Sequence, residues 1–319
     1  MKLGLVCISE ILRDEESIHS KSMTRKKFLS EEKASSISEL SNRILQNVFV
    51  LSKTIGMCSR NGISHLRVSS NMFPLVTDET LSLDYQDLPD IDKIIDGLGE
   101  AGDLARGLGI SLSCHPSQFN VLSSLNPDVV RRTIRELNHE SQVLDWLGCE
   151  SNHTSPMCLH LSRSPTKDET LEEYYDRFYK AFKKCSQGVQ NRLVLENEDK
   201  GFWSCENLYE TFNGLTPFVY DNLHDQCNPS TITYSDHWAK LFKGTWGEYT
   251  PVFHWSEGID GTRKHTDYFS HIPVVVQLNE DVTWECEIKS KDKAIVEALN
   301  VINKDAVFDK PEWQSTVGA

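Results

Sequence analysis

Short apolar runs that end in a histidine or a carboxylate recur along this chain, and helical segments separate them. The run Leu193–Leu195 ends in Glu196, and the run before His160 has the same form. A continuous apolar run of this kind is typical of a strand that is covered on both faces. Eight such runs alternate with helices, which favours a (β/α)8 barrel over an open doubly wound sheet. We therefore predict an α/β fold, a single TIM barrel with its site at the C-terminal ends of the strands.

The predicted elements cover nearly the whole chain as one domain, residues 1–319. The barrel spans about 3–303, and a short tail spans about 304–319. The expected strands are 3–8, 63–68, 111–115, 157–161, 193–196, 218–221, 251–255 and 283–287. The expected helices are 37–58, about 90–107, 128–147, 168–185, 205–212, 234–242, a short piece at 267–270, and 291–301.

Composition limits the classes of function. The net charge of −14 argues against a general nucleic-acid binder, although bound cations would offset part of it and basic residues cluster at 21–27 and at Arg263-Lys264. The nine cysteines form no C-x-x-C pair and are interpreted as small buried hydrophobes in a reducing compartment. No apolar window or signal peptide is evident, so we expect no membrane partner and a cytoplasmic location, bacterial or in a virus-infected cell, with a nuclear one left open.

Residues that bind metals stand where the predicted strands end, and in a barrel of this type these ends form one rim. Asn71 follows the second strand, and the other six histidines are assigned no role: His19, His65, His139, His153, His237 and His271. The candidate ligands are His115, His160, Glu196, Asp221, His224, His254, His265 and Glu287.

So many imidazoles and carboxylates in one place would leave buried groups unpaired, at about 1–3 kcal/mol each, unless cations bind there. Eight candidate ligands exceed the needs of one ion, so we predict two or three divalent ions that share Glu196 as a bridge. Ligands of these types suit Mn²⁺, Zn²⁺ or Fe²⁺ better than metals that prefer thiolates. Clustered cations of this kind hydrolyse phosphate esters.

Several short motifs together resemble the UV damage endonuclease family, whose members are metal-dependent DNA repair nucleases with a TIM barrel. The resemblance runs from Leu3 to about Lys293. The matching segments are 66–74 (LRVSSNMFP), 115–119 (HPSQF), 159–161 (LHL), 195–198 (LENE), 221–224 (DNLH) with Asn228-Pro229, 254–256 (HWS), 265–268 (HTDY) and 287–289 (EIK).

The resemblance implies an endodeoxyribonuclease that cuts duplex DNA immediately 5′ of UV photoproducts and other distorting lesions. The products would be a 3′-hydroxyl and a 5′-phosphate. It implies that the eight candidates above are metal ligands, with Mn²⁺ as the expected metal and Zn²⁺, Mg²⁺ or Co²⁺ as alternatives, and no nucleotide cofactor. We predict Glu196, His254 and Glu287 as the catalytic residues. The predicted contacts to DNA or to the lesion are Gln118, Phe119, Arg67, Asn71, Ser256, Arg263 and Lys289.

Three positions depart from the pattern of the family. Val252 stands where some members carry a lysine near the metals, and Leu5 stands where some carry an aromatic residue. Asn71 replaces a histidine, aspartate or serine. Metal number and lesion range are therefore left open.

Two other functions are weighed against a monomeric nuclease that acts on damaged double-stranded DNA. A sugar isomerase or epimerase of the xylose-isomerase type also places metal ligands at strand ends, but it closes over a small substrate. A catalytically impaired protein that binds damaged DNA is suggested by Val252. Basic residues near the rim, including Arg163, favour an open groove for a nucleic-acid backbone.

Overall fold

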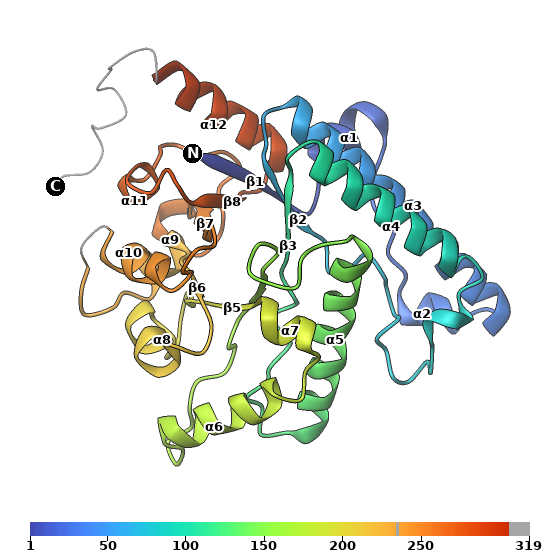
Figure 1. The fold of residues 1–319 in the computed structure, drawn as a ribbon, viewed down its shortest axis with the longest axis horizontal. Helices are drawn as coiled ribbons and strands as arrows, with labels where there is room; N and C mark the ends of the chain where they lie inside the picture. The colour runs from blue at the N-terminus through green and yellow to red at the C-terminus, as the bar shows by residue number, and fades with distance from the viewer. Residues whose placement is uncertain (234–235, 306–319) are drawn as a thin grey trace.

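Eight parallel strands form one nearly closed barrel in this computed structural model, which describes residues 1–233 and 236–305 (Figure 1). The order of neighbouring strands is β6-β5-β4-β3-β2-β1-β8-β7. The strands are β1 (Lys2–Val6), β2 (His65–Val68), β3 (Ser111–Cys114), β4 (Met157–Leu159), β5 (Leu193–Glu196), β6 (Phe218–Val219), β7 (Val252–Ser256) and β8 (Thr283–Glu287). The predicted TIM-barrel fold is confirmed.

The seam between β6 and β7 closes the barrel just below the rim. It consists of one isolated bridge between Asp221 and His254, in which the His254 N–H donates to the Tyr220 carbonyl at 2.9 Å. Both bridged residues are predicted metal ligands. The strand pairing between β6 and β7, which is limited to this one bridge, therefore lies within the candidate site.

Helices surround the strands. The longest, α3 (Lys33–Arg60), α4 (Ile91–Gly107) and α5 (Pro127–Trp146), cover one side of the barrel, and α4 packs against both of the others (Figure 1). The remaining helices are α1 (Glu10–Glu16), α2 (Arg25–Phe28), α6 (Leu171–Phe182), α7 (Gln187–Arg192), α8 (Cys205–Phe212), α9 (Asn222–Cys227), α10 (His237–Gly244), α11 (Val274–Gln277) and α12 (Lys291–Asp305), with short 3-10 turns at Tyr85–Asp87 and Ile259–Gly261. None of the described helices is both long enough and apolar enough to cross a bilayer.

Short helices account for most differences from the predicted elements. The sequence analysis missed α1, α2, α7 and α9, because four to seven residues give too little helical periodicity. The piece predicted at 267–270 is not helical, and α11 follows it instead. Residues 234–235 of the predicted helix 234–242 and residues 306–319 of the predicted tail lie outside the described residues.

A glycine pattern of the dinucleotide-binding type, Gly97-x-Gly99-x-x-Gly102, lies inside α4. In dinucleotide-binding folds these glycines form the turn between a strand and a helix, where the pyrophosphate meets the helix N-terminus. Here a Cβ on Gly102 would come within 1.8 Å of the Leu147 carbonyl oxygen. The pattern therefore serves the close packing of α4 and does not form a phosphate-binding loop.

A buried polar layer fills the barrel beneath the rim. The Glu285 carboxylate on β8 accepts hydrogen bonds from Ser113 and from Arg67, and it lies 2.8 Å from the His65 Nε2. Gly4 on β1 makes room for this layer, since a Cβ there would lie 2.8 Å from the His65 ring. His65, which the sequence analysis left without a role, thus belongs to the polar interior that supports the site.

Candidate metal centre

The Glu196 carboxylate lies at the centre of four histidines that come from four different elements. Its Oε2 lies 3.0 Å from the His115 Nε2 and 3.5 Å from the His160 Nε2. Its Oε1 lies 2.8 Å from the His254 Nδ1 and 3.2 Å from the His224 Nδ1. Because β5 ends at Glu196 among the ends of its neighbours, the fold brings these side chains together.

Asp221 follows β6 and serves two purposes. Its Oδ1 caps α9 by accepting from the backbone N–H groups of Leu223 and His224, at 2.7 and 2.8 Å. Its Oδ2 accepts from the Ser256 hydroxyl at 2.8 Å and lies 3.9 Å from the His254 Nδ1. The cap fixes the first turn of α9, and this turn directs His224 toward Glu196.

The remaining predicted ligands lie on the β7–β8 side of the cluster. Glu287 ends β8, and its Oε1 lies 3.7 Å from the His254 Nδ1. His265 lies in the loop after β7, and its Nε2 is 4.0 Å from the Glu287 Oε2. His254 itself lies within β7 and not at its end, because this strand extends to Ser256.

Arg67 on β2 supports this side of the cluster from below. Its guanidinium donates to Glu285 and to Glu287, and the distance to the Glu287 Oε1 is 2.6 Å. The Arg67 Nη2 lies 2.7 Å from the His254 Nε2, and the Glu285 Oε2 lies 3.3 Å from the same nitrogen. Arg67 thus fixes the orientation of the His254 ring.

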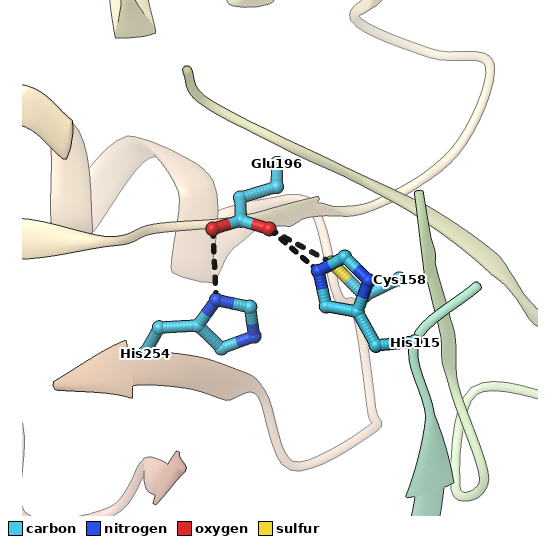
Figure 2. A group of neighbouring side chains, drawn as sticks. All are labelled: His115, Cys158, Glu196 and His254. Carbon is cyan, nitrogen blue, oxygen red and sulfur yellow. Dashed lines mark hydrogen bonds and ion pairs between the residues drawn. The ribbon is translucent and has the colours of Figure 1, made fainter. Parts of the chain in front are cut away.

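Cys158 is a donor that the sequence analysis missed. It lies in the middle of β4, is 5% exposed, and its Sγ is 3.5 Å from the Glu196 Oε2. Figure 2 shows the thiol beside the His115 ring, with both directed at Glu196. Residues two apart on a strand share a face, so the position of Cys158 two residues before His160 was the available signal.

The electrostatics of the cluster favour a charged carboxylate. Burial alone raises the pKa of Glu196, but His254, His160 and other histidines outweigh it and hold that pKa well below its usual range. Burial lowers the pKa of His160 to about 4. Burial also raises the pKa of Glu287, yet Arg67 and His254 outweigh this effect and hold it low. The carboxylates of the site are therefore ionised and His160 is neutral. Burial alone lowers the pKa values of His115, His224 and His254, but Cys158, Asp221 and Glu196, respectively, outweigh it and raise them, so a cation that binds these imidazoles must displace their protons.

The donor set fits divalent cations. His115 and His224 each have Nδ1 near a backbone carbonyl, that of Pro116 at 3.1 Å and that of Asn197 at 2.8 Å. In His115 such a bond holds the proton on Nδ1 and leaves Nε2, which faces Glu196, free for a metal. In His224 the same Nδ1 also lies 3.2 Å from the Glu196 Oε1. Among the described residues, two groups place their donor atoms within 4.8 Å of one another: His115, Cys158, Glu196 and His254, and Glu196, Asp221 and His224. Glu196 belongs to both.

The residues predicted to contact DNA fall into two sets. Phe119 is 80% exposed at the tip of the loop after β3, and Gln118 and Asn71 are also exposed. Arg263 and Lys289 are exposed at the rim, where they pair with Asp199 at 3.2 Å and Asp267 at 3.5 Å. These five side chains can reach a ligand outside the barrel.

The other predicted contacts, Arg67 and Ser256, do not lie on the open surface. Arg67 is 6% exposed and paired with two carboxylates, and Ser256 is buried against Asp221. Arg163, which the sequence analysis counted among the basic residues of the groove, is held by Glu169 at 2.7 and 2.9 Å. In the structure these three side chains pair with groups of the protein and support the site, and their predicted roles toward DNA stay predictions.

Two comparisons with known sequences point to the same family. A family model described as UV-endonuclease UvdE matches residues 1–312. A UV DNA damage endonuclease from a Nostoc species is 27% identical over 303 residues, which cover 92% of this chain and 88% of that protein.

Two solved structures share the fold. The structure of SacUVDE is 24% identical with a TM-score of 0.80, and the match covers 97% of this chain and all of that one. A D-tagatose 3-epimerase-like protein is 12% identical with a TM-score of 0.54, over 96% of this chain and all of that one. Since nucleases and sugar enzymes share this barrel, the fold alone does not separate the two functions.

Proposed function

This chain belongs to the UV-endonuclease UvdE family, and from that premise we propose that it cuts damaged duplex DNA immediately 5′ of a lesion. The lesions are UV photoproducts and others that distort the helix, and the products are a 3′-hydroxyl and a 5′-phosphate. The observation that carries the proposal is the Glu196 carboxylate ringed by four histidines at the barrel rim, with the exposed Phe119 on the loop that follows His115.

Two or three divalent ions, with Mn²⁺ as the expected metal, would activate water and stabilise the developing charge of a leaving oxygen. The residues that would hold them are His115, His160, Glu196, Asp221, His224, His254, His265 and Glu287. Glu196, His254 and Glu287 are the proposed catalytic residues. These residues hold ionised carboxylates next to an imidazole ring at fixed positions. Arg67 and Glu285 keep His254 and Glu287 in position.

Lesion recognition is assigned to the loop after β3. Phe119 offers a free aromatic face, and Gln118 beside it offers an amide. A lesion weakens base stacking, so an aromatic side chain can replace a lost stacking partner at low cost. Phe119 also lines an open surface hollow of about 820 Å³, whose charged lining consists of the arginines Arg25, Arg131 and Arg132 and the carboxylates Asp78, Glu79, Asp128 and Glu136.

The exposed Phe119, Arg263 and Lys289 support the nuclease over a sugar isomerase or epimerase, because a DNA backbone needs exposed basic groups whereas a sugar enzyme must enclose its substrate. Damaged double-stranded DNA is the proposed partner, and a monomer whose one domain spans residues 1–319 is the proposed active form. A relative that binds damaged DNA without cutting it is the second candidate, favoured by the apolar Val252 on the same face of β7 as His254.

A labelled duplex with a single cyclobutane pyrimidine dimer tests the proposal. The protein is incubated with Mn²⁺, with Mg²⁺ or with EDTA, next to an undamaged duplex of the same sequence. We expect one metal-dependent nick just 5′ of the dimer and a 3′ end that a polymerase extends. Tight binding without a nick would favour the impaired binder, and a duplex that is neither bound nor cut would contradict the repair function.

A further inference from the structure

Cys158 lies at the cluster but is not among the eight candidate metal ligands. It is the sulfur-bearing member of the four-residue group with His115, Glu196 and His254 (Figure 2). The other residues of that group are nitrogen and oxygen donors that suit several metals. A thiolate in the same group changes which metal the group prefers.

The two spacings from the Glu196 Oε2, to the Cys158 Sγ and to the His115 Nε2, are close to those of a tetrahedral zinc site. Four donors at about 2.0–2.3 Å from one ion lie about 3.3–3.8 Å from one another. The Glu196 Oε2 lies 3.5 Å from the Cys158 Sγ and 3.0 Å from the His115 Nε2, and the Glu196 Oε1 lies 2.8 Å from the His254 Nδ1. All four donor atoms lie within 4.8 Å of one another, so small side-chain movements complete the site.

The second group, Glu196, Asp221 and His224, has no sulfur. Two carboxylates and one imidazole are a harder donor set, which suits Mn²⁺ or Mg²⁺. The two groups meet at Glu196, whose Oε2 is nearest His115 and Cys158, and whose Oε1 is nearest His254 and His224. The two parts of the cluster therefore differ in chemistry.

We propose that Cys158 is a metal ligand of the group that it forms with His115, Glu196 and His254, and that it makes this group selective for Zn²⁺ over Mn²⁺ and Mg²⁺. On binding, a sulfur–zinc bond forms, the S–H bond breaks, and the thiol proton leaves to solvent. The inference rests on the proposed metal centre and deepens it, because it assigns different metals to the two parts of one cluster.

X-ray absorption at the zinc edge tests this directly on the full chain loaded with one equivalent of Zn²⁺. We expect a Zn–S shell at about 2.3 Å next to Zn–N and Zn–O shells at about 2.0–2.2 Å. The Cys158→Ser variant should lose the sulfur shell. The matched control is Cys185→Ser, since Cys185 is as buried as Cys158 but lies beyond the end of α6, where its Sγ contacts the Ala181 carbonyl. This control should keep the shell.

Zinc affinity, measured by competition with a chelator, gives a second readout. Loss of an outer-shell partner already weakens metal binding about 10- to 100-fold, so loss of a direct ligand should weaken zinc binding by at least that factor. The affinity for Mn²⁺ should change much less in the same variant.

The possible outcomes distinguish the role of Cys158 from the existence of the proposed metal centre. The spectrum of the wild-type protein tests the role of Cys158 even if a variant does not fold. Bound zinc with only nitrogen and oxygen neighbours would overturn the role of Cys158 and leave the metal centre intact. A sulfur shell that persists in Cys158→Ser would also overturn it. Failure of the wild-type protein to bind one equivalent of zinc would overturn this inference, and failure to bind Mn²⁺ as well would overturn the proposed metal centre.

Discussion

Phe119 is the most exposed large hydrophobic side chain among the described residues, at 80%. An aromatic ring in this position gains nothing from packing, and it follows the predicted ligand His115 by only four residues. We expect Phe119→Ala to weaken binding to a dimer-containing duplex by about 1–3 kcal/mol, roughly 5-fold to 150-fold, because stacking on a base is lost. Fluorescence anisotropy in EDTA measures the change.

The control for this variant is Leu278→Ala, since Leu278 directly after α11 is also exposed and apolar, at 56%. It should bind the damaged duplex as the wild-type protein does. Equal affinity of Phe119→Ala and the wild-type protein would remove Phe119 from the lesion contact.

Glu140 on α5 is buried, and its Oε1 has no hydrogen-bond partner. Burial raises the pKa of this carboxyl from 4.5 to about 8, and the nearby Glu136 adds to the effect. Between these two pH values the folded protein keeps a proton that the unfolded chain releases. The contribution of Glu140 to stability is therefore present below pH 4.5 and is lost as the pH rises to about 8.

We expect Glu140→Gln to remove this dependence on pH, because the amide stays neutral and has the same shape. The variant should exceed the wild-type protein in stability by more at pH 8 than at pH 5, with a difference of the order of a few kcal/mol. Urea unfolding at both values measures it. Parallel stability curves for the two proteins would show that Glu140 is already ionised when folded.

At the scale of elements, helix α4 shows how closely the outer layer packs. A Cβ on Gly102 would lie 1.8 Å from the Leu147 carbonyl oxygen, whereas a Cβ on Gly107, in the same helix, meets nothing within 4 Å. We expect Gly102→Ala to destabilise the protein by at least about 1–3 kcal/mol, because a backbone atom must move. Gly107→Ala should stabilise it by about 0.5–1 kcal/mol through helix propensity.

Thermal unfolding of the two variants measures this contrast. The same substitution in the same helix should shift the melting temperature in opposite directions. Equal shifts would mean that α4 does not approach the end of α5 as closely as the structure shows.

The elements also show where sequence patterns suffice. Strand β8 and helix α8 match their predicted bounds, 283–287 and 205–212, because an apolar run or a capped amphipathic segment stands between clear turns. The short α9 was not predicted. Its first turn depends on the Asp221 side chain as an N-cap, and an aspartate after a strand can be either a metal ligand or a helix cap. Local patterns thus fix long elements better than short ones.

For the whole molecule, one rim could be predicted because parallel strands bring their C-terminal ends together whatever their exact register. That rule gathered His115, His160 and Glu196 correctly, since each of them ends a strand or follows one directly. The rule could not predict whether Arg67 lies at the surface or in the interior, because the sequence does not show that this basic residue has buried acidic partners. The ion pair of Arg67 with Glu285 joins residues 218 positions apart.

The same limit explains Cys158. A cysteine in an apolar run is most often a small packing residue, and only the closed barrel shows that this thiol faces Glu196. The negative net charge of −14 was likewise ambiguous, since a cluster of metal-binding carboxylates lowers the charge without excluding DNA.

The cluster around Glu196 is the proposed site of incision in damaged DNA, and a comparison of two variants tests this proposal. Glu196→Gln and Glu140→Gln make the same chemical change at two buried carboxyl groups, one inside the cluster and one on an outer helix. Both are assayed with Mn²⁺ on a duplex that carries one cyclobutane pyrimidine dimer. We predict that Glu196→Gln loses incision by about a thousandfold or more, as expected when the metal-binding carboxylate is neutralised, whereas Glu140→Gln cuts as the wild-type protein does. Incision by Glu196→Gln at the wild-type rate would contradict the account.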